Sequence, residues 1–199
     1  MKILAFNKWD VDEIKVEDIG LQKYMNLSPR IVPKTGARYA GKRFHKSKTF
    51  IVERLINRLM VPGHKGKKHS KSSGHCCGTA SQTYGYVEEA LKIIEKKTNK
   101  NPVEIFVKAL ENASPREEIV TIEYGGARYP KAVDCAPQRR IDMALKFFSQ
   151  GTYDKCFNKK ISFPEALADE ILAAFKLDQN KSAAIKKKLE LERQADASR

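Results

Sequence analysis

Residues 117–148 read EEIVTIEYGGARYPKAVDCAPQRRIDMALKFF, and this stretch decides the fold. β-branched and aromatic residues dominate Glu118–Tyr124, so this segment is predicted to be a strand. Gly125 and Gly126 follow it, and glycine permits the positive φ values of a two-residue hairpin turn. The return strand is expected over Arg128–Cys135. The stretch therefore predicts an antiparallel β-hairpin.

A helix is predicted directly after the hairpin. Pro137 suits its first turn, because the N–H that proline lacks has no intrahelical partner there. Apolar residues then recur at spacings of three and four from Ile141 to Phe148, which gives one buried face, and Gly151 is expected to end the helix. An isolated hairpin is marginally stable in water. We therefore expect the hairpin to project from a helical body and to meet a partner.

The rest of the chain carries further helical patterns. Helices are predicted over 47–60, 81–97, 102–113, 163–175 and 180–199, the last with few apolar residues. Asn101 before Pro102 predicts a helix cap, and Ser162 with Glu165 has the spacing of a capping box. Residues 1–25 are expected to contain a further helical segment. Residues 64–78, rich in Lys, Gly, Ser and His, are expected to be a loop that is mobile unless bound.

Together these patterns predict a mainly α protein, a single-domain bundle of about six helices with a protruding two-stranded antiparallel β-hairpin. Within it, residues 1–46 are interpreted as an N-terminal extension and basic arm. Residues 47–199 are interpreted as a helical RNA-binding domain, with the hairpin at about 118–135. No break in composition across the 199 residues calls for a second core.

The positive charge of the chain is concentrated in one region. The whole sequence has 38 Lys and Arg against 24 Asp and Glu, a formal net charge of +14. Thirteen of these basic residues lie between Pro29 and Val87, where Glu53 is the only acidic residue. Glycines and the aromatic residues Tyr39 and Phe44 are interspersed with them. A one-sided excess of this kind favours binding to phosphate groups, as in nucleic acids.

Other classes of protein are disfavoured by what the sequence lacks. No apolar run approaches the roughly 20 residues of a membrane-spanning helix, and Met1–Trp9 does not resemble a signal peptide. The protein is therefore expected in the cytoplasm, with its cysteines as reduced thiols. No motif typical of nucleotide-binding loops, serine hydrolases or zinc proteases is found, so no enzyme activity is expected.

One loop contains five residues of types that bind metal ions: His64, His69, His75, Cys76 and Cys77. Adjacent cysteines do not easily bind one tetrahedral ion together, and a polar loop is the preferred interpretation. No metal and no cofactor are expected. Cys135 and Cys156 are interpreted as small core residues rather than nucleophiles.

Several short motifs resemble one family. They are Gly36–Phe44 (GARYAGKRF), Ile51–Leu55 (IVERL), Pro115–Glu118 (PREE), Gly125–Pro130 (GGARYP), Val133–Asp134, Pro137–Arg140 (PQRR) and Leu167–Ile171 (LADEI). Together they closely resemble the small-subunit ribosomal protein seven family. The segments Trp9–Met25 and Ala184–Arg199 resemble its archaeal and eukaryotic branch, so the resemblance covers nearly the full chain.

The resemblance implies a mostly helical protein that is a structural constituent of the small ribosomal subunit. Such a protein binds the head, or 3′ major domain, of the small-subunit ribosomal RNA and helps to nucleate assembly of the head. It also lies near exit-site tRNA and messenger RNA, and beside other proteins of the head. The segment 64–78 departs from the family in being longer and richer in His, Ser and Gly.

Two groups of site residues follow from the charge pattern and the resemblance. RNA contacts are expected from Arg30, Lys34, Arg38, Lys42, Arg43, Lys46, Lys48, Lys65, Lys67, Lys68, Arg116, Arg128, Arg139 and Arg140. The hairpin tip, expected near tRNA and mRNA, comprises Gly125, Gly126, Arg128 and Tyr129. Composition alone also allows a free-standing protein that binds DNA or tRNA without sequence preference, and a metal-dependent nuclease at the His/Cys loop is a third hypothesis.

Overall fold

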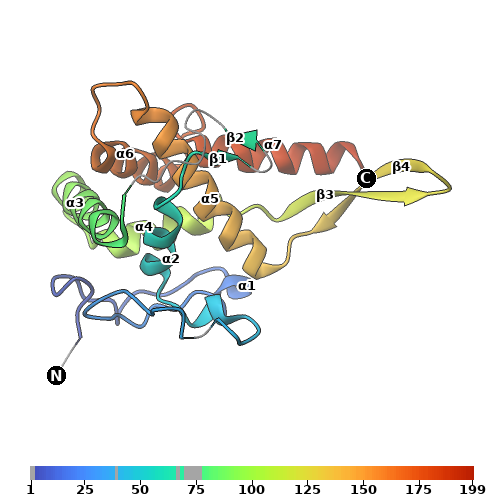
Figure 1. Ribbon diagram of the computed structural model, residues 1–199. Coiled ribbons are helices and arrows are strands. Elements are labelled where there is room, and N and C mark those ends of the chain that lie inside the picture. Colours follow the sequence, from blue (N-terminus) through green and yellow to red (C-terminus); the bar gives the residue numbers. More distant parts are fainter. Residues whose placement is uncertain (1–2, 39, 66–67, 70–77) are drawn as a thin grey trace.

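Helix α6, Phe163–Phe175, is central to the packing of the body, because it contacts α3, α4, α5 and α7. The computed structural model describes residues 3–38, 40–65, 68–69 and 78–199 (Figure 1). The helices are α1 Ile19–Gln22, α2 Ile51–Leu59, α3 Ala80–Thr98, α4 Pro102–Ala113, α5 Pro137–Cys156, α6 and α7 Ala183–Ala197, with a 3₁₀ turn at His45–Lys48. The strands are β1 His64–Lys65, β2 Lys68–His69, β3 Glu117–Tyr124 and β4 Ala127–Asp134. The predicted mainly helical domain with a hairpin is confirmed.

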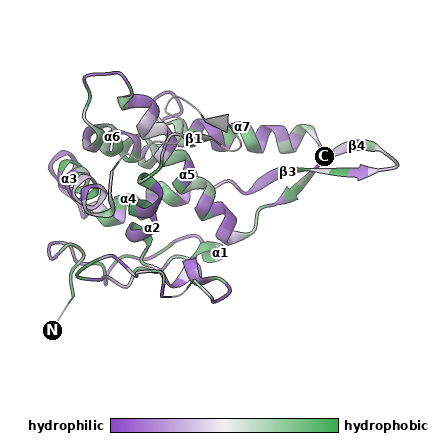
Figure 2. Cartoon of the chain, viewed as in Figure 1, coloured by the Kyte–Doolittle hydropathy of each residue, from purple (hydrophilic) through white to green (hydrophobic). Residues whose placement is uncertain are grey.

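The hydrophobic core lies between the helices. Phe106 of α4 and Phe148 of α5 are fully buried, with ring centroids 6.4 Å apart. Each helix carries hydrophobic and hydrophilic stretches, as Figure 2 shows, and the predicted apolar spacings mark the buried faces. The predicted caps are also confirmed. Asn101 accepts a hydrogen bond from the Val103 N–H at 3.0 Å, and Ser162 with Glu165 forms a capping box.

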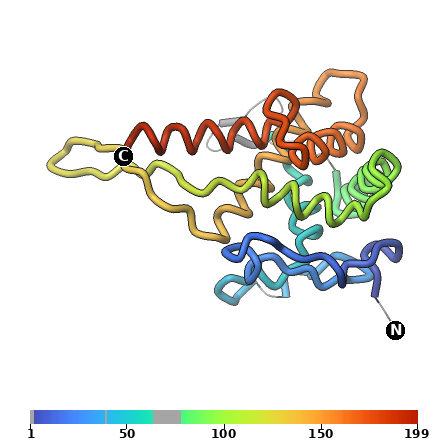
Figure 3. Tube along the Cα trace, turned by 180° about the vertical axis from the view of Figure 1, so that it is seen from behind, coloured from blue at the N-terminus to red at the C-terminus, as the bar shows by residue number. Residues whose placement is uncertain are grey.

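The hairpin extends away from the helices (Figures 1 and 3). β3 and β4 pair from Glu117–Asp134 at the base to Tyr124–Ala127 at the tip. Gly125 and Gly126 have φ values of 57° and 82°, the left-handed values that the two-residue turn requires. Its base packs against α7, and from Val120 outward both strands are exposed as far as Pro130.

The N-terminal segment, residues 3–27, is packed onto the helices although most of it is not helical (Figure 3). Phe6 contacts the rings of Trp9 and Tyr84, and Trp9 is buried. The helix expected within residues 1–25 is reduced to the four residues of α1. Left-handed φ values at Phe6 and Asn7 interrupt any regular helix before it. Burial against α3 and α4 decides the conformation here. The division of the chain at residues 46 and 47 stays a prediction.

The expectation that Gly151 ends the fourth predicted helix was wrong. α5 continues through it to Cys156. A Cβ atom at Gly151 would lie 2.9 Å from the Cβ of Ala183 and 3.1 Å from the carboxyl group of Glu170. Glycine is needed here because α6 and α7 approach α5 closely, and not because the backbone must turn.

Two predicted helices start later than expected. The first was expected from Ser47, but Thr49 and Phe50 are extended, and the Ile51 N–H donates to the Asn26 carbonyl at 2.9 Å. Pairing with the N-terminal segment therefore delays α2 to Ile51. The last helix was expected from Asn180 and begins at Ala183, because Ser182 caps it.

None of the helices in the described part of the chain combines the length and the apolar character that a membrane crossing requires. The predicted 64–78 loop lies mostly outside the described residues. Its described part forms the short antiparallel β1–β2 pair, His64 with His69 and Lys65 with Lys68.

Candidate nucleic-acid interface

A basic groove of about 1060 Å³ lies between the arm, α2 and α5. Its Lys and Arg lining residues are Lys34, Lys46, Arg54, Arg58, Arg139 and Lys146, and His45 also lines it. Two carboxylates, Glu53 and Asp142, also line it. The arm and α2, which are neighbours in the sequence, and the distant α5 thus contribute positive charge to one concave surface, which is the arrangement that a polyanion requires.

The spacing of the basic residues on each helix places them on the same face. Arg54 and Arg58 are four residues apart on α2, about one helical turn. Arg139 and Lys146 are seven residues apart on α5, about two turns. Because α2 packs against α5, these two basic rows line the same groove.

Asp142 neutralises only part of this charge. Its carboxylate lies 2.9 Å from Nη2 of Arg54 and 3.2 Å from Nζ of Lys46. Burial lowers the pKa of Arg54, and the ion pair with Asp142 opposes this effect. Arg54 also donates to the Tyr24 carbonyl at 3.3 Å, so it joins the N-terminal segment to the groove wall.

The surroundings of Lys146 oppose its positive charge. Burial lowers the pKa of its ammonium group, and the nearby guanidinium groups of Arg58 and Arg139 lower the pKa further. The charged form of Lys146 is thus disfavoured in the unbound protein. A phosphate group between these three cations would reverse that effect, because it would attract all of them.

Glu53 holds the basic arm against α2. Its side chain is buried, and Oε1 accepts a hydrogen bond from the Thr35 N–H at 2.7 Å. Pro33 is buried next to this contact. The single acidic residue of the 29–87 region therefore fixes the arm, and it places Lys34 at the groove.

The remaining predicted arm residues lie at the surface around the groove. Lys42 and Lys48 are exposed, and Arg30 is half-buried. The Arg43 guanidinium lies 5.1 Å from the centroid of the Phe44 ring, and Nε of Arg38 donates to the Thr35 carbonyl at 3.1 Å. They extend the basic surface without lining the groove.

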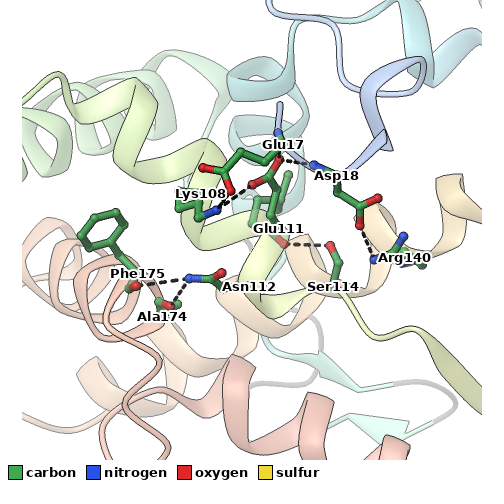
Figure 4. A network of polar contacts seen from close by, with 10 residues as sticks. Glu17, Asp18, Lys108, Glu111, Asn112, Ser114, Arg140, Ala174 and Phe175 are labelled. Atoms are coloured by element: carbon green, nitrogen blue, oxygen red, sulfur yellow. Dashed lines mark hydrogen bonds and ion pairs between the residues drawn. The ribbon is translucent and has the colours of Figure 1, made fainter. Parts of the chain in front are cut away.

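Two predicted residues, Arg116 and Arg140, lie elsewhere, in the lining of a second cleft. Figure 4 shows Arg140 next to Asp18. Nη2 of Arg140 lies 2.7 Å from Oδ2 of Asp18, and Nε donates to the Pro115 carbonyl at 3.1 Å. Burial alone would raise the pKa of Asp18, but the hydrogen bond and charge of Arg140 outweigh it and lower that pKa. Arg140 therefore joins the N-terminal segment to the base of the hairpin.

The hairpin residues are far more open. Arg128 lies next to the turn, with Nε 3.6 Å from the Glu123 carboxylate, and Gly125, Gly126 and Tyr129 are exposed. Arg139 connects the groove to the hairpin, because Nε lies 2.6 Å from Oε1 of Glu118. Lys65 and Lys68 belong to the β1–β2 pair, and Lys67 lies outside the described residues.

Sequence reasoning missed four groove residues: His45, Arg54, Arg58 and Lys146. Arg54 and Arg58 were counted in the basic region but not selected as contacts. The signal that could have found Lys146 is its two-turn spacing from Arg139. The position of His45 depends on the path of the arm, which local sequence does not determine.

The described residues give little support to a metal site or to a nucleophilic cysteine. No cluster of three or more His, Cys, Asp or Glu side chains suited to a metal ion occurs among them. His75, Cys76 and Cys77 of the considered metal loop lie outside the described part of the chain. Burial and the nearby Glu118 carboxylate raise the pKa of the Cys135 thiol to about 11, which disfavours a nucleophilic thiolate.

Comparisons with known proteins agree with the geometry. Residues 21–199 match the family model described as Ribosomal protein S7p/S5e. A protein named small ribosomal subunit protein uS7 from Nanoarchaeum equitans is 50% identical over 199 residues, with all of both chains covered. The proteins of the same name from Methanococcus aeolicus and Methanothermobacter thermautotrophicus are 45% and 46% identical, covering 100% and 96% of this chain and of their own length.

Proposed function

The chain belongs to the ribosomal protein S7p/S5e family, and from this premise we propose that it anchors to small-subunit ribosomal RNA through the basic groove. As a small-subunit ribosomal protein it is part of a ribonucleoprotein that acts in translation. Its place is on the ribosome, in the cytoplasm. Its relatives are named as ribosomal proteins, a structural class rather than a class of enzymes.

The observation that carries the proposal is the excess of Lys and Arg over acidic side chains in the lining of the groove. Burial lowers the pKa of Lys146, and the nearby positive charges of Arg58 and Arg139 lower it further, so the charged form of Lys146 costs free energy in the unbound protein. Natural surfaces accept this cost where a polyanion compensates it. The exposed arm cations Lys42 and Arg43 would add phosphate contacts beside the groove.

We further propose that the RNA partner is the head domain and that binding helps to nucleate assembly of the head. In this arrangement the groove and arm hold the RNA backbone, while the hairpin reaches beyond the anchored body. The exposed Tyr124 and Tyr129 at its end are suited to contact bases of exit-site tRNA or of mRNA. Neighbouring head proteins would contact other surfaces of the helical body.

The test is a competition experiment with the purified full-length chain at one fixed salt concentration. A transcript of the ribosomal head domain competes against duplex DNA of equal length and against tRNA. We expect the head transcript to bind at least about tenfold more tightly, because it offers a shaped set of phosphates and unpaired bases. Equal affinity for all three would contradict the proposal and favour nonspecific nucleic-acid binding. Replacement of Arg58 and Lys146 by Ala should weaken binding, whereas replacement of the exposed Lys186 and Lys187 should not.

A further inference from the structure

The second cleft, of about 790 Å³, shares no lining residue with the basic groove. It lies between the N-terminal segment, α4, the start of α5 and α7. In Figure 4 the carboxylates of Glu17 and Asp18 point toward Lys108 and Arg140 on the facing helices. Its chemistry therefore has to be considered separately from RNA binding.

Most charges in this cleft are paired within the chain. Glu17 forms an ion pair with Lys108. Oε1 of Glu111 accepts hydrogen bonds from the N–H groups of Glu17 and Asp18, at 2.7 and 3.2 Å. Asp18 in turn is paired with Arg140. These groups hold the N-terminal segment in place and leave little charge for a ligand.

Lys188 of α7 takes part in none of these ion pairs. Its Nζ donates to the Asn112 carbonyl at 2.9 Å, the single acceptor it reaches among the described residues. Burial lowers the pKa of Lys188; Glu192 opposes that effect, while Arg116 and Arg140 add to it. A half-buried side chain whose ammonium group has donors to spare thus lines the cavity, and an acidic group placed there would stabilise its charge.

The rim of the cleft carries two exposed aliphatic side chains. Ile19 is 85% exposed and Leu177 is 56% exposed. Leu177 also has a left-handed φ of 57° at the end of α6, where glycine is the favoured residue. A leucine at such a position gains neither burial nor an easy backbone conformation in the unbound chain, which is typical of a residue that is covered by a partner.

We propose that this cleft docks an acidic, partly aliphatic segment of a neighbouring protein. A carboxylate of the segment binds Lys188, and its apolar side chains cover Ile19 and Leu177. RNA is the less suitable occupant, because the carboxylates that line the cleft equal its cations in number and leave no net positive charge for a phosphate backbone. A peptide has few negative charges and can place one of them at Lys188 while keeping away from these carboxylates.

Photocrosslinking in purified small subunits tests the docking. The chain carries p-benzoylphenylalanine in place of Leu177, and crosslinked products are identified by mass spectrometry. We expect an adduct with a protein segment that has Asp or Glu within a few residues of the crosslink. Adducts only with RNA, only with a second copy of this chain, or with nothing would overturn the proposal. The same amino acid in place of Ile161, which is exposed but does not line the cleft, should not give that adduct.

A synthetic peptide of the crosslinked segment then tests the chemistry on the purified chain. Lys188→Gln should weaken peptide binding by roughly tenfold or more, because a charge-assisted hydrogen bond is lost. Lys186→Gln, on the exposed side of the same helix, should leave it unchanged. Leu177→Gly suits the left-handed backbone, so it should fold at least as stably and still weaken binding. Unchanged binding in either cleft variant would overturn the proposal. Affinity for ribosomal RNA should not change in these variants, which separates this result from the test of the groove.

Discussion

Nζ of Lys155 lies 2.5 Å from Oε2 of Glu170, a carboxylate that is fully buried where α5, α6 and α7 meet. The other oxygen, Oε1, accepts hydrogen bonds from Oγ of Ser182 at 2.9 Å and from the Ala184 N–H at 3.0 Å. Glu170 therefore supplies negative charge to the N-terminus of α7, where the helix dipole favours it. One side chain joins three helices.

Glu170→Ala should lower the free energy of unfolding by about 3 kcal/mol, because it leaves two buried donors without an acceptor and Lys155 without its partner. Urea denaturation of the purified chain measures this value. Asp169→Ala is the matched control, since Asp169 is exposed and pairs at the surface with Lys97. It should cost less than about 1 kcal/mol. Equal losses of unfolding free energy in the two variants would show that the buried Glu170 carboxylate does not hold the three helices together.

Gly151→Ala should destabilise the chain by about 1–3 kcal/mol, because the new methyl group would contact Ala183 and Glu170 too closely. Gly85→Ala in α3 is the control. Among the described residues, no heavy atom beyond the adjacent residues and backbone of the same helix lies within 4 Å of a Cβ placed there. It should stabilise the chain by about 0.5–1 kcal/mol through helix propensity. Thermal unfolding of both variants gives the comparison, and a stabilised Gly151→Ala would contradict close packing at this site.

Gly151 also illustrates what sequence can and cannot predict in this fold. Periodic apolar residues and local caps predicted the helices, because each depends on residues within one or two turns. The role of Gly151 depends on α6 and α7, which are remote in sequence, so low helix propensity alone gave the wrong helix end. The prediction of a helix within residues 1–25 was largely wrong for a similar reason, since contacts with α3 and α4 determine the path of this segment.

At the candidate site, too, some features follow from the sequence and others depend on contacts between remote segments. The concentration of charge between Pro29 and Val87 predicted the kind of partner, since net charge is a property of composition. Which cations face one groove depends on the packing of α2 against α5. The structure places Lys146 in the groove, whereas Arg140 pairs with Asp18 in the second cleft, and the sequence did not indicate either position; the expected RNA contacts stay a prediction.

Cys135 should react slowly with iodoacetamide in the folded protein. Its pKa of about 11 lies above the roughly 8.5 of an unperturbed thiol. The reactive thiolate is therefore scarce at pH 8, and the rate should rise about tenfold per pH unit up to about pH 10. Peptide mapping distinguishes Cys135 from the other cysteines. In denaturant the thiol should react near its ordinary pKa, and rapid labelling of the folded chain at pH 8 would contradict the burial of Cys135.

The same pKa shift has a consequence for stability. A raised pKa in the folded state means that the unfolded chain releases this proton more readily. The burial of the neutral Cys135 thiol therefore contributes fully to the free energy of unfolding below the unfolded pKa of about 8.5. This contribution is lost as the pH rises toward the folded pKa of about 11. Cys135→Ala should remove this part of the loss of stability at alkaline pH. Urea denaturation at pH 8 and at pH 10 should therefore show a smaller drop in unfolding free energy for the variant than for the unmodified chain.

RNA binding should depend steeply on salt. If the arm and groove make roughly six to ten phosphate contacts, raising salt from about 50 to 200 mM should reduce affinity by about 10³ to 10⁵. Arg58→Ala with Lys146→Ala should lower the slope of log affinity against log salt by roughly 1.5. The control pair, Lys186→Ala with Lys187→Ala on α7, should leave the slope unchanged. A flat salt response of the unmodified chain would exclude electrostatic anchoring by the groove.

The hairpin end should be separable from RNA anchoring. Deleting Thr121–Tyr124 and Ala127–Pro130 removes exposed residues and keeps Gly125–Gly126 as the turn between Val120 and Lys131. Removal of four residues from each strand preserves the alternation of the two faces. The contacts at the base remain, including Arg139 with Glu118. We therefore expect an unchanged thermal midpoint and normal incorporation into subunits, with weaker retention of exit-site tRNA.

Replacement of Arg38, Lys42 and Arg43 by Ala should have the opposite effect. These side chains are exposed, so the fold should be retained, but the loss of three phosphate contacts should weaken incorporation into subunits. The deletion removes one acidic and one basic residue, Glu123 and Arg128, so it leaves the net charge unchanged. A difference between the two variants therefore separates contact at the hairpin from charge in the arm. If the shortened hairpin lost incorporation as severely as the triple variant, or unfolded, the hairpin would be an anchoring or core element.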